Sequence, residues 1–383
     1  MRSRKLIMRI IFHLPLDLEH SRSISGVSGS YLRPLKVRKA FEELGCVVDT
    51  VWGSASERKK QIRKIKMNVS NGIIYDFIYS ESSTMPTLLT EPNHLPISPS
   101  IDFGFFRWAK KNGIPVGLFY RDIYWRFEQY KKEVSYKRFF TIPFYYLDII
   151  IYHKFVDCLF LPSLKMLDKL PGTWPKDRVF ALPPGGELLP SETSIKCTFR
   201  DNLPLRLIYV GGVKPPLYNL SVVFDGLKNF ASEQVKLTVC CRKQEWKNSN
   251  EQYKPSNSTV QIVHEHGEAL KLRYINRDVA LLLFDSCSYR GFALPLKLFE
   301  AFCYKVPVLA STGTAVGEFV EQEGIGWVIK ADYKSFRNWV NFILEHPEDL
   351  EKKRQIVNEM AVYHTWQERA KTVAQILSGG TYK

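Results

Sequence analysis

The chain has 383 residues, enough for two domains of ordinary size. Hydrophobic residues make up 45% of it and charged residues 24%, which excludes extensive intrinsic disorder. The formal net charge of +15 favours an anionic partner, such as a nucleic acid, a phosphate-bearing small molecule or an acidic membrane surface. Residues 1–190 carry 29 Lys/Arg against 18 Asp/Glu, so most of the excess lies in the first half.

Cysteines and apolar runs bear on the cellular compartment. The seven cysteines are irregularly spaced and form no CxxC pair, which indicates reduced thiols in a cytoplasmic protein without a zinc site. No apolar run reaches the length of about 18 residues that a membrane-spanning helix needs. Arg9 interrupts the N-terminal apolar run, so residues 6–14 are expected to form a buried first strand and not a signal peptide.

Short apolar runs then alternate with amphipathic stretches. Helices are expected over residues 31–45, closed by Gly45, and over residues 101–113. Buried strands are expected in VVDTVWG, GIIYDFIYS, PVGLFYRD, DCLFLPS and RVFALPP. This alternation predicts an α/β domain with a parallel sheet and helices on both faces.

A Pro- and Gly-rich break near residues 182–204 separates this series from a second one. The second series contains the strand candidates LRLIYVGG, KLTVCC, VQIVHEHG, DVALLLFD, VPVLAS and GWVIKAD. We therefore predict two Rossmann-like domains, over residues 1–190 and 205–365, joined by a linker at 191–204. A C-terminal helix over residues 366–383 is expected to cross back to the first domain.

The segment RGFALPLKLFEAFCYKVPVLAS, residues 290–311, carries the strongest chemical signal. It follows a buried strand, and Pro295 marks the start of a helix. Lys297 and Glu300 share a face near the helix N-terminus, where free amides and the helix dipole favour an anion. Lys297 suits a phosphate, and Glu300 suits the vicinal hydroxyls of a ribose. An ordinary solvated Lys/Glu pair is the alternative.

This stretch resembles the donor-binding motif of glycosyltransferases of the GT-B fold. The pattern P-x-K-x-x-E-A followed by V-P-V-L, from Pro295 to Leu309, is similar to that of many bacterial sugar transferases. The resemblance continues through residues 312–329. It implies that Lys297 contacts the diphosphate of a nucleotide sugar and that Glu300 contacts its ribose.

The resemblance also carries expectations about the whole protein. It implies two domains facing a central cleft, a nucleotide diphosphate sugar as co-substrate, and neither a cofactor nor a protein-bound metal. The expected reaction is hexosyl transfer to a glycan or polyprenyl-diphosphate-linked acceptor in surface polysaccharide synthesis, at the inner face of the membrane. Phe292 stands where the large retaining family four carries an acid, eight residues before Glu300, so a retaining outcome is not implied.

Further donor-binding candidates lie in two loops of the second domain. Gly211 and Gly212 directly follow a strand, where glycine lets backbone amides approach a phosphate, and Lys214 is placed to assist. A simple strand-to-helix turn is the alternative. His266, in VHEHG, is assigned to a loop that binds the nucleotide base or is structural. His264 and His266 lack a third ligand for a metal.

Two loops of the first domain carry the remaining candidates. By the resemblance, Gly26 and Gly29 lie in a Gly/Ser loop that approaches the donor, and Arg33 follows in the next helix. Arg121 and Asp122 follow a buried strand, at the usual ligand position of a parallel sheet. We assign Asp122 as the general base and Arg33 and Arg121 as acceptor-binding residues. Helix capping by Asp122 and a solvated Arg33 are the alternatives.

Residues 119–160 contain 15 aromatic side chains, and a basic run precedes the segment FFTIPFYYLDIII. This combination is typical of an interfacial segment, so residues 131–151 are expected to meet an anionic membrane surface. A buried aromatic helix with a solvated basic start is the alternative. A nucleic-acid partner is not expected, because no nucleic-acid-binding signature is present.

Two other functions are compatible with this pattern. One is a nucleotide-sugar 2-epimerase on the same fold, which needs further acid/base residues that the sequence does not identify. The other is a non-catalytic nucleotide or nucleic-acid binder.

Overall fold

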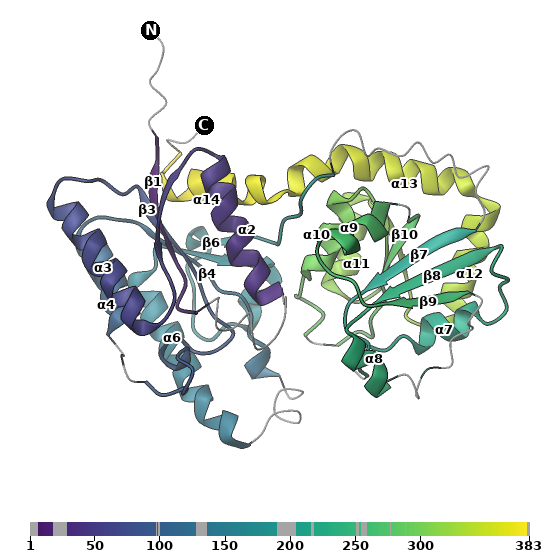
Figure 1. The fold of residues 1–383 in the computed structure, drawn as a ribbon, viewed down its shortest axis with the longest axis horizontal. Coiled ribbons are helices and arrows are strands. Elements are labelled where there is room, and N and C mark those ends of the chain that lie inside the picture. The colour runs from purple at the N-terminus through teal and green to yellow at the C-terminus, as the bar shows by residue number, and fades with distance from the viewer. Residues whose placement is uncertain are drawn as a thin grey trace, which may run out of the picture. The chain divides into compact units, whose positions relative to one another are not determined.

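The computed structural model describes residues 7–17, 29–96, 98, 100–127, 136–189, 204–215, 218–249, 253, 259–275, 277–287 and 289–380, with the backbone alone at 29–30 and 136–138. The chain divides into two compact units, Met1–Pro183 with Trp366–Lys383 and Pro184–Thr365 (Figure 1). Each unit is built on a six-stranded sheet in which every described pair of strands is parallel. The predicted α/β layout of two Rossmann-like domains is confirmed.

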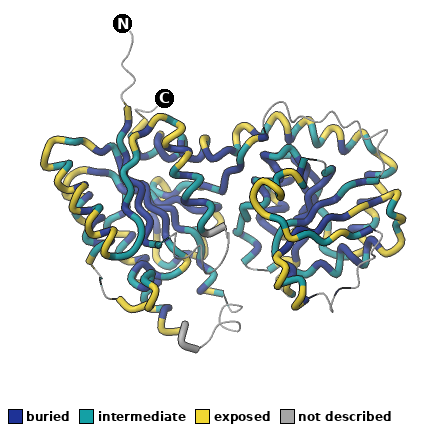
Figure 2. Tube along the Cα trace, in the orientation of Figure 1, coloured by how far each residue is buried: buried dark blue, intermediate teal, exposed yellow. Residues whose placement is uncertain are grey.

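The sheet of the first unit has the strand order β2-β1-β3-β4-β5-β6. Its strands are β1 (Arg9–His13), β2 (Val47–Val51), β3 (Phe77–Glu81), β4 (Val116–Phe119), β5 (Cys158–Leu161) and β6 (Val179–Ala181). Its helices are α2 (Gly29–Glu43), α3 (Ala55–Ser70), α4 (Ile101–Lys111), α6 (Ile142–Phe155) and α14 (Trp366–Leu377). Each apolar run that predicted a strand contains one, because buried parallel strands are apolar on both faces (Figure 2).

Helices cover both faces of this sheet because the connections run in opposite directions along it. The chain steps one way from β1 to β2 through α2, and then the other way through α3, α4 and α6. Right-handed crossovers therefore place α2 on one face and the other three helices on the opposite face. α14 packs against α2 and β4 (Figure 1). The C-terminal helix thus returns to the first unit, as predicted.

The return of α14 depends on one glycine. A Cβ at Gly117 of β4 would come within 2.6 Å of the Leu377 side chain and 2.8 Å of the Phe160 ring. Only a residue without a side chain lets the helix lie this close to the strand.

The sheet of the second unit has the order β12-β11-β10-β7-β8-β9. Its strands are β7 (Leu205–Val210), β8 (Val235–Cys240), β9 (Val260–Val263), β10 (Val279–Leu282), β11 (Val308–Ser311) and β12 (Gly326–Ile329). Its helices are α7 (Ser221–Leu227), α8 (Lys243–Ser249), α9 (Glu268–Ile275), α10 (Leu296–Cys303), α11 (Ala315–Glu323), α12 (Tyr333–Glu345) and α13 (Pro347–Met360). The direction of the strand order reverses between β7 and β10, which is the position where open α/β sheets bind ligands.

Two features of the connections bear on the sequence predictions. The described chain leaves the first unit after Pro183, and residues 191–203 of the predicted linker lie outside the described residues. Gly45 has a φ of 83° and lies two residues after Glu43, the last residue of α2, as expected of a residue that closes a helix. None of the described helices combines the length and the apolar character needed to cross a bilayer.

Candidate functional site

The reversal of strand order in the second unit brings two loops together. β7 is followed directly by Gly211 and Gly212, and β10 is followed by residues 283–295, which lead into α10. α10 buries Leu298, Phe299, Ala301 and Phe302 in the core of the second unit, which fixes its first turn at the carboxyl ends of β7 and β10. The predicted donor-binding residues of both loops therefore lie at one place.

Lys297 lies in the first turn of α10, and its Nζ is buried above Gly211. A Cβ at Gly211 would stand 2.7 Å from this Nζ, and the φ of Gly211 is 147°. Within the described part of the chain, no acceptor lies within hydrogen-bond distance of the Nζ. A buried ammonium group without a hydrogen bond is costly in free energy, so the arrangement favours a ligand that supplies an acceptor.

Three aromatic rings surround this ammonium group. The Nζ lies 4.5 Å from the ring centroid of Phe284, 4.8 Å from that of Tyr209 and 5.3 Å from that of Tyr218. Cation–π attraction to these rings offsets part of the hydration that Lys297 loses. None of the three rings is among the site residues predicted from the sequence.

Arg290 is a second cation at the same place. Its side chain is 5% exposed, and its Cζ lies 4.2 Å from the Phe284 centroid and 5.1 Å from that of Tyr218. Burial and the charge of Arg290 lower the pKa of Lys297 to about 7, against the opposing effect of Glu300. Two cations that share two aromatic rings repel each other, so a bound anion relieves the repulsion.

Gly212 and Lys214 lie beside this cation pair. A Cβ at Gly212 would come within 2.8 Å of the Tyr218 ring, so glycine is needed for Tyr218 to reach Lys297. The Lys214 side chain is exposed. The backbone carbonyl oxygen of Lys214 accepts a hydrogen bond of 3.1 Å from the Tyr218 amide. The role of Lys214 in donor binding stays a prediction, since its side chain lies exposed to solvent.

His266 lies in the loop between β9 and α9, where its side chain is exposed. His264 hydrogen-bonds through Nδ1 to the carbonyl oxygen of Cys241 at 2.8 Å. Among the residues with described positions, no three His, Cys, Asp or Glu side chains are grouped so that they hold a metal ion.

In the first unit, the carboxylate of Glu81 brings Arg33 and Arg121 together. Glu81 is fully buried at the end of β3, 3.3 Å from Arg33 Nε and 3.1 Å from Arg121 Nη2. The Arg33 guanidinium also lies 3.5 Å from the Phe119 ring centroid. Glu81 is not among the residues predicted from the sequence, although an acid at the end of a buried strand is the same signal that singled out Asp122.

Asp122 and the glycines of the first loop complete the predicted site residues. Asp122 Oδ1 accepts a hydrogen bond of 3.0 Å from the Tyr124 amide, at the start of the short helix Tyr124–Arg126. This contact is a local Asx turn that precedes the helix. The N-cap residue is Ile123, without a side-chain cap, so Asp122 does not form the helix cap that the sequence offers as the alternative to a general base. Gly29 is the first residue of α2, one turn before Arg33, and Gly26 lies outside the described residues.

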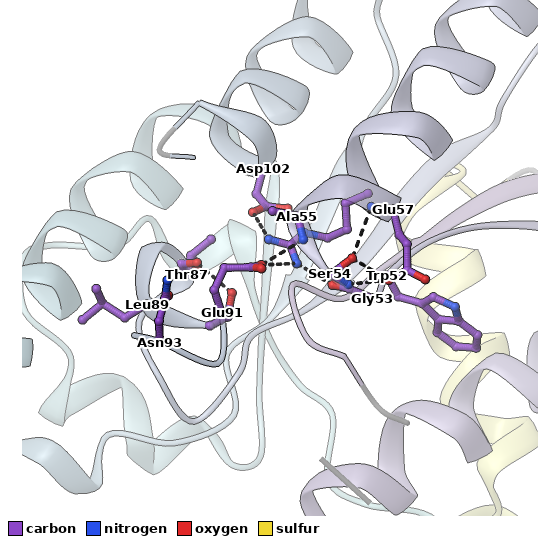
Figure 3. Close-up of polar contacts among 12 residues, drawn as sticks. Trp52, Gly53, Ser54, Ala55, Glu57, Thr87, Leu89, Glu91, Asn93 and Asp102 are labelled. Carbon is purple, nitrogen blue, oxygen red and sulfur yellow. Dashed lines mark hydrogen bonds and ion pairs between the residues drawn. The ribbon is translucent and has the colours of Figure 1, made fainter. Parts of the chain in front are cut away.

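A buried polar network supports the end of β1. His13 Nε2 lies 3.0 Å from Asp102 Oδ1, and its Nδ1 lies 2.8 Å from the hydroxyl of Ser80. Arg58 donates to both oxygens of Asp102, at 3.0 and 3.1 Å, and also contacts Glu91 (Figure 3). Although burial raises the pKa of Asp102, His13 and Arg58 hold it below its ordinary value. The network fixes the strand ends near Glu81.

Several solved structures share this architecture over nearly their whole length. HepE of Anabaena, solved in complex with UDP, is 14% identical with a TM-score of 0.62, covering 97% of this chain and 100% of that chain. Sucrose-phosphate synthase from Thermosynechococcus elongatus is 13% identical with a TM-score of 0.62, covering 96% and 98%. WaaG, a glycosyltransferase involved in lipopolysaccharide biosynthesis, is 12% identical with a TM-score of 0.55, covering 97% and 100%.

The chain has the GT-B fold. No protein-family model matches the sequence, and no curated protein matches it. The GT-B fold implied by the resemblance of residues 290–329 is confirmed at the level of structure. In this fold, the loops after β7 and β10 form the candidate ligand site of the second unit.

Proposed function

We propose that the protein is a glycosyltransferase that moves a sugar from a nucleotide diphosphate sugar to a glycan or polyprenyl-diphosphate-linked acceptor in surface polysaccharide synthesis. The observation that carries the proposal is the buried Nζ of Lys297, which has no hydrogen-bond acceptor among the described residues and lies at the start of α10. The similarity to HepE, which was solved with UDP and with UDP-glucose, supports a nucleotide sugar as the donor.

The donor diphosphate would receive hydrogen bonds from Lys297 and from the free amides at the start of α10. The same groups would stabilise the negative charge that develops on the leaving nucleoside diphosphate. Glu300, three residues later on the helix, would accept hydrogen bonds from the ribose hydroxyls. We propose that this cationic stabilisation makes the reaction independent of a metal ion and of any other cofactor.

The acceptor would bind to the first unit. Asp122 lies after β4 and is proposed to remove the proton from the acceptor hydroxyl. Arg33 and Arg121 together carry two positive charges against the single charge of Glu81, so they favour an acceptor that bears a phosphate.

A lipid-linked acceptor requires access to a membrane, which we propose for residues 131–151. Of these, residues 131–135 lie outside the described residues. In the described part of the segment, Phe140 is 75% exposed and Ile150 is 66% exposed, whereas large apolar side chains normally face the core. An exposed apolar surface of this kind is typical of an interfacial segment.

Thermal-shift measurements with UDP-, GDP-, dTDP- and CDP-sugars test the proposal first. We expect one nucleotide family to stabilise the protein and oligonucleotides to leave it unchanged. Incubation of that donor with lipid-linked acceptor, followed by mass spectrometry, should then show an acceptor that is one hexose heavier, also in the presence of EDTA. A free sugar epimer as the product would instead indicate the 2-epimerase.

Lys297→Ala is the decisive variant. It should lower kcat by about 100-fold or more, because the charge on the leaving group loses its main cation. Lys330→Ala, at an exposed position of the same unit, is the matched control and should leave turnover unchanged. Near-normal transfer by Lys297→Ala would contradict the assignment.

A further inference from the structure

The helices α3, α4 and α6 form a layer whose outer face is strongly basic. Neighbouring helices of the layer are in contact. Lys66 of α3 lies 5.5 Å from the ring centroid of Trp108 on α4, and Lys110 of α4 donates to the carbonyl oxygen of Lys154 on α6 at 3.0 Å. The exposed charged side chains of these three helices are nine Lys or Arg and one Glu: Lys59, Lys60, Arg63, Lys64, Lys66, Arg107, Lys110, Lys111, Lys154 and Glu57.

The acidic residues of the layer do not balance these charges. Asp102 and Asp148 are 4% and 3% exposed, and Asp102 is already paired with the buried Arg58. The helix α2, on the other face of the same sheet, is different. There Arg38 and Glu42 lie 3.0 Å apart, and Lys39 and Glu43 lie 3.3 Å apart. The unbalanced charge is therefore specific to one face of the sheet.

The same layer exposes apolar side chains at its α6 end. Phe140 is 75% exposed, Ile150 66%, Tyr146 43% and Leu147 38%, and Phe139 precedes them at 42%. The three in α6 recur at a spacing of three and four residues, so they lie on the outward face of the helix. α6 thus carries apolar side chains on its inner and outer faces, although only the inner face is buried.

We propose that the outer face of the α3–α4–α6 layer is a docking surface for an anionic phospholipid bilayer. The cations of α3 and α4 would lie at the headgroup phosphates, and the apolar side chains of α6 would enter the boundary of the acyl chains. The charge pattern alone would also suit a nucleic acid. Phe139, Phe140 and Tyr146 offer rings that suit either a base or the bilayer interface. The bilayer is favoured because the exposed Leu147 and Ile150 are aliphatic, and a nucleic acid would leave them in water. The inference rests on the proposed function in one respect: a lipid-linked acceptor is the reason why the protein needs to reach a membrane.

Vesicle sedimentation tests this surface with the full-length protein. The probe is vesicles of phosphatidylcholine and phosphatidylglycerol in equal parts, compared with phosphatidylcholine alone. The variant Lys60→Glu/Lys64→Glu/Arg107→Glu should weaken binding to the anionic vesicles by about 100-fold, since each cation near such a surface strengthens binding several-fold. Binding by the unaltered protein should also weaken as salt is raised.

Matched variants separate the docking surface from net charge. Lys236→Glu/Lys334→Glu/Lys352→Glu makes the same change in charge at exposed positions of the second unit and should bind vesicles as the unaltered protein does. Phe140→Ser/Ile150→Ser should weaken vesicle binding without changing the net charge. Equal losses in the two charge-reversed variants would overturn the proposal, because net charge alone would then explain binding.

A nucleic acid is the other occupant to be tested. Fluorescence anisotropy with single-stranded and duplex oligonucleotides should show weak binding that Phe140→Ser/Ile150→Ser leaves unchanged. Tight oligonucleotide binding that the α3–α4 reversal abolishes, together with no vesicle binding, would assign the surface to a nucleic acid. Failure of this proposal can be distinguished from failure of the proposed function, since the α3–α4 variant should keep its thermal shift with the nucleotide sugar. Lys297→Ala should lose the thermal shift and keep vesicle binding.

Discussion

The Nζ of Lys297 lies so close to Gly211 that a Cβ there would stand 2.7 Å from it. Gly211→Ala should therefore displace the ammonium group and strain a backbone with a φ of 147°. We expect a loss of about 1–3 kcal/mol in the free energy of unfolding, measured by denaturant titration, together with weaker nucleotide-sugar binding. Gly324→Ala is the control, because its φ is 68° and its nearest contact would be 3.8 Å, to Ile356. Equal effects on nucleotide binding in the two variants would contradict a specific role for Gly211.

Nucleotide-sugar affinity should depend on pH through Lys297. Burial and Arg290 lower the pKa of this lysine to about 7, whereas the bound diphosphate favours its charged form. Affinity should therefore fall as pH rises above about 7, by at most tenfold per pH unit, until the pKa of the complex is reached. Calorimetry in buffers of different ionisation enthalpy should detect proton uptake on binding. Lys297→Arg should flatten the profile, because guanidinium stays charged. An unchanged profile in that variant would assign the titration to another group.

The same pKa shift bears on the stability of the ligand-free protein. In the folded protein, Lys297 releases its proton at a pH well below its value in the unfolded chain, near 10.4. The unfolded chain therefore binds more protons between about pH 7 and pH 10, so the contribution of this group to stability rises with pH across that window. The nucleotide sugar should remove part of this dependence.

Arg290→Ala should act on the donor site through charge. Removing the like charge should raise the pKa of Lys297 and move the midpoint of the binding profile to higher pH. At pH 6, affinity should fall by about tenfold or more if Arg290 also contacts the diphosphate. Arg242→Ala, which alters an exposed arginine of the same unit, is the control. If Arg290 has only a structural role, Arg290→Ala should lower the free energy of unfolding and leave the pH midpoint of the binding profile unchanged.

Glu81→Gln should destabilise the first unit. The substitution leaves two buried guanidinium groups without their shared carboxylate, which costs about 3–5 kcal/mol of unfolding free energy. Glu42→Gln removes an exposed partner of Arg38 on α2 and should cost about 1 kcal/mol or less. Denaturant unfolding that shows similar losses for both variants would mean that the buried pairing contributes little.

Substitutions of Asp122 can separate a role as general base from a structural role in the turn before Tyr124. Asn keeps an oxygen that accepts from the Tyr124 amide but cannot take a proton, so Asp122→Asn should preserve stability and donor binding. If Asp122 is the general base, kcat should fall by about 100-fold or more in this variant. Full turnover by Asp122→Asn, with lower stability in Asp122→Ala, would mean that Asp122 only stabilises the local turn before Tyr124.

The strands and most helices were predictable because buried parallel strands form apolar runs that helices separate. The runs around Ile208 and Ala280 are apolar on both faces, so their pattern required no tertiary information. Lys297 and Glu300 could be proposed as a pair for a similar reason, since helix spacing alone puts them on one face.

The surroundings of these residues depend on tertiary structure. Tyr209 lies in β7 and Phe284 lies in the segment after β10, far apart in the chain, and nothing local indicates that both face the Lys297 ammonium group. The pairing of Arg33 with Glu81 likewise depends on how α2 packs on the sheet. The basic face of α3 and α4 was not predicted, because it depends on how the two helices align beside α6.

The return of α14 to the first unit makes that unit discontinuous along the chain. During synthesis, every element of the second unit leaves the ribosome before α14 does, so the unit that begins first is completed last. Until then, Gly117 and the inner face of α2 lack the helix that covers them. A premature stop immediately before Trp366 would leave the whole second unit in place and still leave Glu81, Arg33 and Arg121 in an unfinished domain.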